Sequence, residues 1–183
     1  MEHEMQPIIY DVAVSLDGFI SGPSGDISLF SHDGPVVDDY NQRLTTYSTA
    51  IMGRATYEFG YGFGLKPGQN PYSHMETLIF SDQLEIPHAS DVRLIRKADK
   101  FDLYELKKSA AGPIYLCGGG DFAGSLLNDG LIDLVRVKRA PIVLRQGVSL
   151  FGNHEGSQNL ERLNTKYYEN GYLLEEFRPQ PLK

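Results

Sequence analysis

Residues 114–122 combine an apolar strand pattern, three consecutive glycines and the start of a helix. The strand is Ile114-Tyr115-Leu116-Cys117, and Gly118-Gly119-Gly120 leads into Asp121-Phe122. Glycine permits positive φ angles and lets backbone amides approach a ligand closely. The first amides of the following helix are unpaired and carry partial positive charge, so the segment can cradle a diphosphate. Tight packing alone explains such a turn about as often.

A second strand–glycine–helix segment occurs at Ile51-Met52-Gly53-Arg54-Ala55-Thr56-Tyr57. Arg54 lies at the mouth of the helix, where its guanidinium can hold a phosphate through two hydrogen bonds, and Thr56 can donate a hydroxyl. A capping or salt-bridging Arg54 is an equally good interpretation. Two such turns at the carboxyl ends of strands favour one extended ligand across the sheet edge, and a dinucleotide has that shape.

Strand and helix patterns alternate through the chain, and we expect one α/β domain over residues 1–183. Apolar, β-branched runs predict strands, and helical spacing predicts helices. The predicted strands are residues 7–14, 49–52, 77–80, 92–95, 114–117 and 131–144. The predicted helices are residues 35–47, 54–59, 121–127 and a segment capped by Asp102. Asn170-Gly171 between β-rich runs predicts a hairpin. The pattern therefore predicts a mixed, mostly parallel sheet, flanking helices and a C-terminal antiparallel hairpin.

Composition and charge exclude several classes of protein. The net charge of -7 argues against nucleic acid as the main partner, since phosphate binding needs clustered Lys and Arg. No apolar run approaches the ~20 residues of a membrane span, and the N-terminus lacks the pattern of a secretory signal. The single cysteine, Cys117, reads as an inert core thiol, and the five scattered histidines predict no metal site. We expect a cytoplasmic protein with a small-molecule partner.

Several short motifs follow one another along nearly the whole chain. They are Val14-Ser15-Leu16-Asp17-Gly18-Phe19-Ile20, Met52-Gly53-Arg54-Ala55-Thr56-Tyr57-Glu58, Gly118-Gly119-Gly120 with Ser125-Leu126-Leu127, Gly130-Leu131-Ile132-Asp133 and Gly147-Val148-Ser149-Leu150-Phe151. In this order they resemble the dihydrofolate reductase-like family that includes the riboflavin-biosynthesis reductase of the RibD C-terminal type. The resemblance implies a central eight-stranded sheet, four helices, NADPH as hydride donor and a homodimer. Riboflavin-type members reduce a ribosylamino-pyrimidine phosphate.

The same resemblance assigns cofactor-binding positions. By resemblance, Gly53, Arg54 and Thr56 would lie at the cofactor phosphates. The diphosphate would be bound by Gly118, Gly119, Gly120, Asp121 and Phe122. The backbone of Val12 and Ala13 would meet the nicotinamide amide, and Ser81 would lie near the adenosine ribose.

Asp82 departs from the family pattern, which often has a basic residue near the 2′-phosphate at this position. A carboxylate there repels that phosphate and accepts from a free 2′-hydroxyl instead. Arg54, Arg96 and Lys97 could compensate. We therefore expect NADPH as the cofactor, with a weakened preference that leaves NADH possible.

A reductase that protonates a ring nitrogen benefits from a carboxyl group of raised pKa. Dihydrofolate reductases place one on the helix before the Met-Gly-Arg turn, where Asp38 and Asp39 lie in this chain. Asp39 is the better candidate because it lies roughly 100° from Tyr40 at the centre of the apolar stripe, against roughly 160° for Asp38. An Asp39–Arg43 surface pair is the favoured alternative. Asp17 is a second catalytic candidate, although Asp-Gly more often forms a turn.

These features predict an NAD(P)H-dependent reductase of the riboflavin-biosynthesis type, acting on a pyrimidine- or pterin-like heterocycle. True dihydrofolate reduction is one alternative. A small-molecule or nucleotide-binding protein of the same fold, without turnover, is the other.

Overall fold

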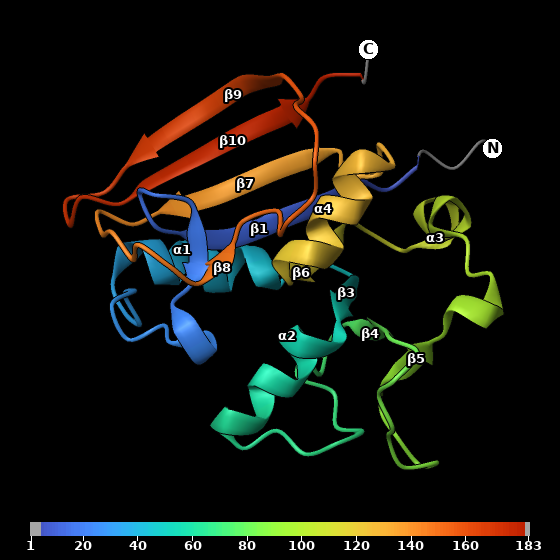
Figure 1. Cartoon of the computed structure of the whole chain (residues 1–183). Coiled ribbons are helices and arrows are strands. Elements are labelled where there is room, and N and C mark those ends of the chain that lie inside the picture. Colours follow the sequence, from blue (N-terminus) through green and yellow to red (C-terminus); the bar gives the residue numbers. More distant parts are fainter. Residues whose placement is uncertain (1–4, 182–183) are drawn as a thin grey trace.

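Eight strands form one mixed sheet in the computed structural model, which describes residues 5–181 (Figure 1). The order across the sheet is β5-β4-β3-β6-β1-β7-β10-β9. The strands are β1 (Ile8–Val14), β3 (Thr49–Gly53), β4 (Glu76–Phe80), β5 (Arg93–Ile95), β6 (Ile114–Gly118), β7 (Leu134–Arg139), β9 (Leu160–Tyr167) and β10 (Leu173–Pro179). The strands from β5 to β7 in this order are parallel, whereas β10 pairs antiparallel with β7 and with β9. β2 (Phe19–Ser21) and β8 (Val148–Ser149) form a small separate sheet.

Helices cover both faces of the large sheet. The α-helices are α1 (Pro35–Leu44), α2 (Arg54–Phe59), α3 (Leu103–Ser109) and α4 (Gly120–Asn128). Side chains alternate along a strand, so neighbouring residues of β1 serve opposite faces. Ile8 packs in the core that contains Leu106 of α3 and Leu126 of α4, whereas Ile9 packs in the core beside α1 that contains Tyr57 of α2. The predicted fold class, mixed sheet, flanking helices and C-terminal hairpin included, is confirmed.

Two predicted elements end earlier than expected, and local side-chain or backbone chemistry explains both. The first helix ends at Leu44 rather than near Tyr47, where Thr45 and Thr46 hydroxyls donate to helix carbonyls at 2.7 Å each. Such bonds compete with helix continuation. The strand predicted over 131–144 is only β7, and beyond it the chain turns at Pro141, which lacks a ladder donor.

No helix within residues 5–181 is long and apolar enough to cross a membrane. The same described residues contain no cluster of three or more His, Cys, Asp or Glu side chains suited to a metal ion. Open α/β sheets bind their ligands at the carboxyl edge of the parallel strands, and the candidate site of this chain lies there.

Candidate functional site

The strands β1 and β6 separate toward their carboxyl ends. Their described pairs run from Ile8–Ile114 to Tyr10–Leu116, whereas the pairing of β1 with β7 continues to Val14–Arg139. A cavity of 380 Å³ lies at this separation, and Val12 and Ala13 line it from β1. Backbone groups at this end of β1 are therefore placed to meet a ligand rather than a neighbouring strand.

The cavity has mostly apolar and aromatic walls. Tyr115 and Cys117 line it from β6, Tyr40 from α1 and Phe59 from the end of α2. The remaining lining residues are Asp11, Val12, Ala13, Ile20, Ile27, Phe30, Ser31, His32, Val36, Val37, Asn41, Lys138 and Tyr172. A concave apolar site with a few polar groups is the usual form of a small-molecule site.

Lys138 and Asp11 form a buried ion pair in the cavity wall. Lys138 Nζ donates to Asp11 Oδ1 at 2.7 Å and lies 3.8 Å from the centroid of the Tyr40 ring. Only 9% of the Lys138 side chain and none of the Asp11 side chain is exposed. Burial lowers the pKa of Lys138, although Asp11 opposes the shift. Burial alone would raise the pKa of Asp11, but Lys138 and Arg43 outweigh it and hold that pKa below its usual range.

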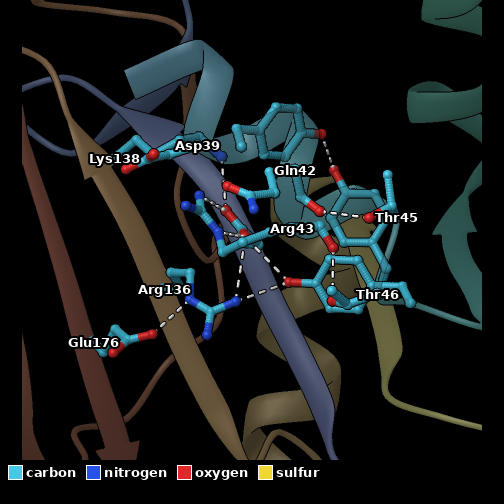
Figure 2. A network of polar contacts seen from close by, with 12 residues as sticks. Asp39, Gln42, Arg43, Thr45, Thr46, Arg136, Lys138 and Glu176 are labelled. Carbon is cyan, nitrogen blue, oxygen red and sulfur yellow. Dashed lines mark hydrogen bonds and ion pairs between the residues drawn. The ribbon is translucent and has the colours of Figure 1, made fainter. Parts of the chain in front are cut away.

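The ion pair belongs to a wider polar network between α1 and the sheet (Figure 2). Arg43 Nε donates to Asp11 Oδ2 at 2.9 Å, and the Tyr47 hydroxyl donates to the same oxygen at 3.1 Å. Arg136 donates to Tyr47 at 3.0 Å and to Glu176 at 2.7 Å. The sequence-based site does not include Asp11 or its cationic partners. The available signal was a lone acid inside the apolar run of β1.

Asp39, the first predicted acid, lies outside the cavity lining. Its Oδ2 accepts from Lys166 and from the Tyr168 hydroxyl, and the Lys166 hydrogen bond holds the pKa of Asp39 below its usual value. A ring-protonating acid needs the opposite shift. The alternative Asp39–Arg43 pair does not form either, because Arg43 binds Asp11. The catalytic role of Asp39 stays a prediction that this geometry disfavours.

Asp17, the second predicted acid, holds two loops together. Its carboxylate accepts from Ser15 Oγ at 2.6 Å and from the backbone amides of Leu144 and Arg145 at 3.1 and 2.7 Å. The Ser15 hydrogen bond is the main cause that lowers the pKa of Asp17 to about 2. This placement matches the turn-forming alternative, and catalysis by Asp17 stays a prediction.

The two glycine turns meet at the sheet edge. A Cβ built on Gly53 would lie 3.4 Å from the Cβ of Phe122, and one on Gly119 would lie 3.1 Å from Thr56 Oγ1. Gly119 is the N-cap of α4, and no side chain caps the first amides of that helix. Uncapped amides next to a hydroxyl and a side-chain-free turn suit an anionic group. These residues therefore fit a dinucleotide diphosphate.

Three residues beside this turn have other contacts. Arg54 pairs with Glu58 at 3.3 Å, and both side chains are substantially exposed, so the pair holds the guanidinium weakly. Asp121 Oδ1 accepts from the Asn153 amide at 3.2 Å. Phe122 stacks on Phe80 with ring centroids 5.0 Å apart. Arg54 is thus free to exchange its partner for a phosphate.

Ser81 and Asp82 form the turn after β4. Ser81 Oγ accepts from two following amides, and Asp82 Oδ1 accepts from the Lys97 amide at 2.8 Å. The Arg96 guanidinium donates to the carbonyls of Ser81, Asp82 and Leu84. To offset the repulsion between Asp82 and a 2′-phosphate, Arg96 would therefore have to give up these hydrogen bonds.

Similarity to known proteins agrees with this arrangement. The model of the RibD C-terminal domain family matches residues 6–174. Uncharacterized protein YyaP of Bacillus subtilis (strain 168) is 28% identical over 174 residues, which is 91% of each chain.

Solved structures of related fold also match over nearly the whole length. A putative riboflavin biosynthesis protein from Shewanella sp. PV-4 is 23% identical with a TM-score of 0.76, covering 97% of this chain and 100% of that one. Dihydrofolate reductase from Enterococcus faecalis, complexed with NADP(H), is 16% identical with a TM-score of 0.66, covering 98% of both chains. The chain belongs to the RibD C-terminal domain family, whose fold is dihydrofolate reductase-like.

Proposed function

We propose that this protein is an NAD(P)H-dependent reductase of a planar pyrimidine- or pterin-like heterocycle. The observation that carries the proposal is the adjacency of the cavity and the glycine turns. Cys117 lines the cavity, and the next residue along β6 begins the turn that leads into α4. A dinucleotide held at the turn is thereby next to a ring bound in the cavity.

The cofactor would be held by residues of both turns. Gly118 to Gly120 and the first amides of α4 would bind the diphosphate, with Arg54 and Thr56 at the phosphates. Val12 and Ala13 would meet the nicotinamide amide, because their backbone lies where β1 has left β6. The nicotinamide supplies a hydride when it is bound.

The residues of the chain itself perform the remaining tasks. Tyr40, Phe59 and Tyr115 give the cavity an aromatic wall against which a planar ring can pack. Lys138 supplies a donor at the cavity wall. The pairing of Asp39 with Lys166 disfavours the acid of true dihydrofolate reduction, so a riboflavin-type reaction is the better candidate.

The experiment that tests this function has two stages. Calorimetric titration with NADPH and NADH measures binding, and absorbance then follows NADPH oxidation with pyrimidine and pteridine substrates. The proposal predicts binding of a reduced nicotinamide dinucleotide and its oxidation with at least one heterocycle. Binding without oxidation across the panel would favour a protein that binds but does not turn over. Absence of binding at millimolar cofactor would refute the proposal.

A further inference from the structure

One ammonium group lies in the cavity wall, and a buried carboxylate fixes its position. Lys138 stands opposite Ala13 in the β1–β7 ladder, and its Nζ donates to Asp11 Oδ1 at 2.7 Å. An ammonium carries three N–H donors. Across residues 5–181, Asp11 is its single hydrogen-bond acceptor. Because Lys138 lines the cavity, donor capacity remains for a ligand there.

The charges behind Lys138 leave an excess of positive charge. Asp11 also pairs with Arg43 at 2.9 Å and with Arg136 at 3.5 Å, and Arg136 pairs with Glu176 at 2.7 Å. Three cations in this group therefore meet two carboxylates. Arginine does not lose its proton in proteins. The low dielectric of a buried site strengthens the effect of the remaining positive charge on a ligand in the cavity.

We propose that Lys138 recognises the substrate ring and donates its proton, so that the substrate is a planar oxo-heterocycle with an oxygen or nitrogen facing this ammonium. The proposal rests on the proposed reductase function for its hydride source. In the reaction, a C–H bond forms at the ring carbon that receives the hydride, and the π electrons of its C=N or C=O bond move to the heteroatom. The heteroatom takes a proton from Lys138 Nζ. The ring bond gains the two electrons that the nicotinamide loses, and water returns a proton to the amine.

The titratable side chains of β1, β6, α1 and Tyr47 that surround Lys138 are poorly suited to donate this proton. The Tyr40 and Tyr115 hydroxyls bond to each other at 2.6 Å, and burial raises the pKa of both far above the usual value. Burial also raises the pKa of the Cys117 thiol. Asp11 stays ionised, and the Tyr47 hydroxyl is bonded to it. Burial lowers the pKa of Lys138, and a lower pKa makes its ammonium a better proton donor near the working pH.

The test uses lumazine (pteridine-2,4-dione), a planar oxo-heterocycle whose neutral and anionic forms absorb differently. Its absorbance is measured free and bound over a series of pH values. The positive excess at Lys138 should favour the bound anion. We expect the pKa of bound lumazine to fall by about one unit or more, which corresponds to at least a tenfold preference for the anion. Lys138→Met should abolish the shift, and Lys138→Arg should retain part of it.

Lys108→Met is the matched control, because Lys108 is exposed on α3 and pairs with Glu105. It should leave the lumazine shift unchanged. If Lys138→Met does not fold by circular dichroism, Lys138→Gln removes the positive charge but keeps an amide donor for Asp11, and it should also lose the shift. The wild-type shift by itself remains a test that needs no variant.

Several results would overturn the proposal. One is the absence of lumazine binding at millimolar concentration, and another is an unshifted pKa of the bound ring. A shift that persists in a folded Lys138→Met protein would assign the effect to other groups. Displacement of lumazine by millimolar inorganic phosphate in the wild type, but not in Lys138→Met, would make Lys138 a phosphate-binding group instead. The separate NADPH titration distinguishes failure of the reductase function, since the lumazine shift requires no cofactor.

Discussion

Asp11→Ala should lower the free energy of unfolding by about 3–5 kcal/mol, the usual cost of removing one partner from a buried ion pair. The Asp11 side chain is fully buried and accepts from Lys138, Arg43 and Tyr47. Alanine would leave the Lys138 ammonium, 9% exposed, without its carboxylate. Arg43 is better hydrated, so the loss falls mainly on Lys138.

Urea denaturation followed by circular dichroism measures this loss. Asp33→Ala is the matched control, because the exposed Asp33 side chain has no ion pair or side-chain hydrogen bond among the residues described. It should change the free energy of unfolding by about 0.5 kcal/mol or less. In the cycle with Lys138→Met, the double variant should be more stable than the two single losses predict, because the buried ammonium is removed together with its carboxylate.

The pH dependence gives an independent check. The folded-state pKa of Asp11 lies below its unfolded value of ~3.9, so its contribution is present above about pH 4 and is lost as pH falls toward the folded pKa. Asp11→Ala should therefore flatten the acid limb of the stability curve. A variant within about 1 kcal/mol of the wild type at pH 7, with an unchanged acid limb, would refute the electrostatic role assigned to Asp11.

Further predictions concern the cofactor, the pH profile and assembly. Arg54→Ala should weaken NADPH binding by about 1.5–3 kcal/mol, the usual contribution of a charge-assisted hydrogen bond. An unchanged calorimetric affinity would show that Arg54 only pairs with Glu58 and does not bind the cofactor. Asp82→Arg should raise the affinity for NADPH more than for NADH, and equal shifts would show that Asp82 does not face the 2′ position. Turnover should fall as pH rises through the pKa of Lys138, which burial holds below its ordinary value. Lys138→Arg should move that fall to higher pH, and a pH profile identical in both proteins would contradict proton donation by Lys138. Light scattering at micromolar protein should show a dimer, because the edge strand β9 exposes apolar side chains that a second copy could cover: Leu160, Leu163 and 77% of Tyr167. A species of 20.4 kDa would contradict this expectation.

Local signals in the sequence predicted most of the elements. The bounds of α2 are those predicted for the helix that follows the strand and Gly53, and the strands β3, β4 and β6 lie within one residue of the predicted runs. Both glycine turns occur at strand carboxyl ends, and the structure brings them together. These features depend on periodicity and backbone freedom, which a short segment encodes by itself.

Long-range contacts explain what the sequence did not predict. Helical spacing placed Asp39 beside the apolar stripe, but its partners Lys166 and Tyr168 come from the C-terminal hairpin. The pairing of Asp11 with Lys138 depends on the register of β1 against β7, which no local pattern specifies. The sequence alone therefore did not identify Lys138 as a buried residue, because its burial depends on pairing with Asp11.

Calorimetric titration of the purified protein with NADPH and NADH tests the central claim most directly. The uncapped amides of α4, the Gly118 to Gly120 turn and the exposed Arg54 should bind one dinucleotide per chain in a saturable, salt-sensitive manner. Gly119→Val should abolish this binding in a folded protein, because a Cβ there would already lie 3.1 Å from Thr56 Oγ1. Heat of binding that is absent for both cofactors at millimolar concentration, or unchanged in Gly119→Val, would contradict the account.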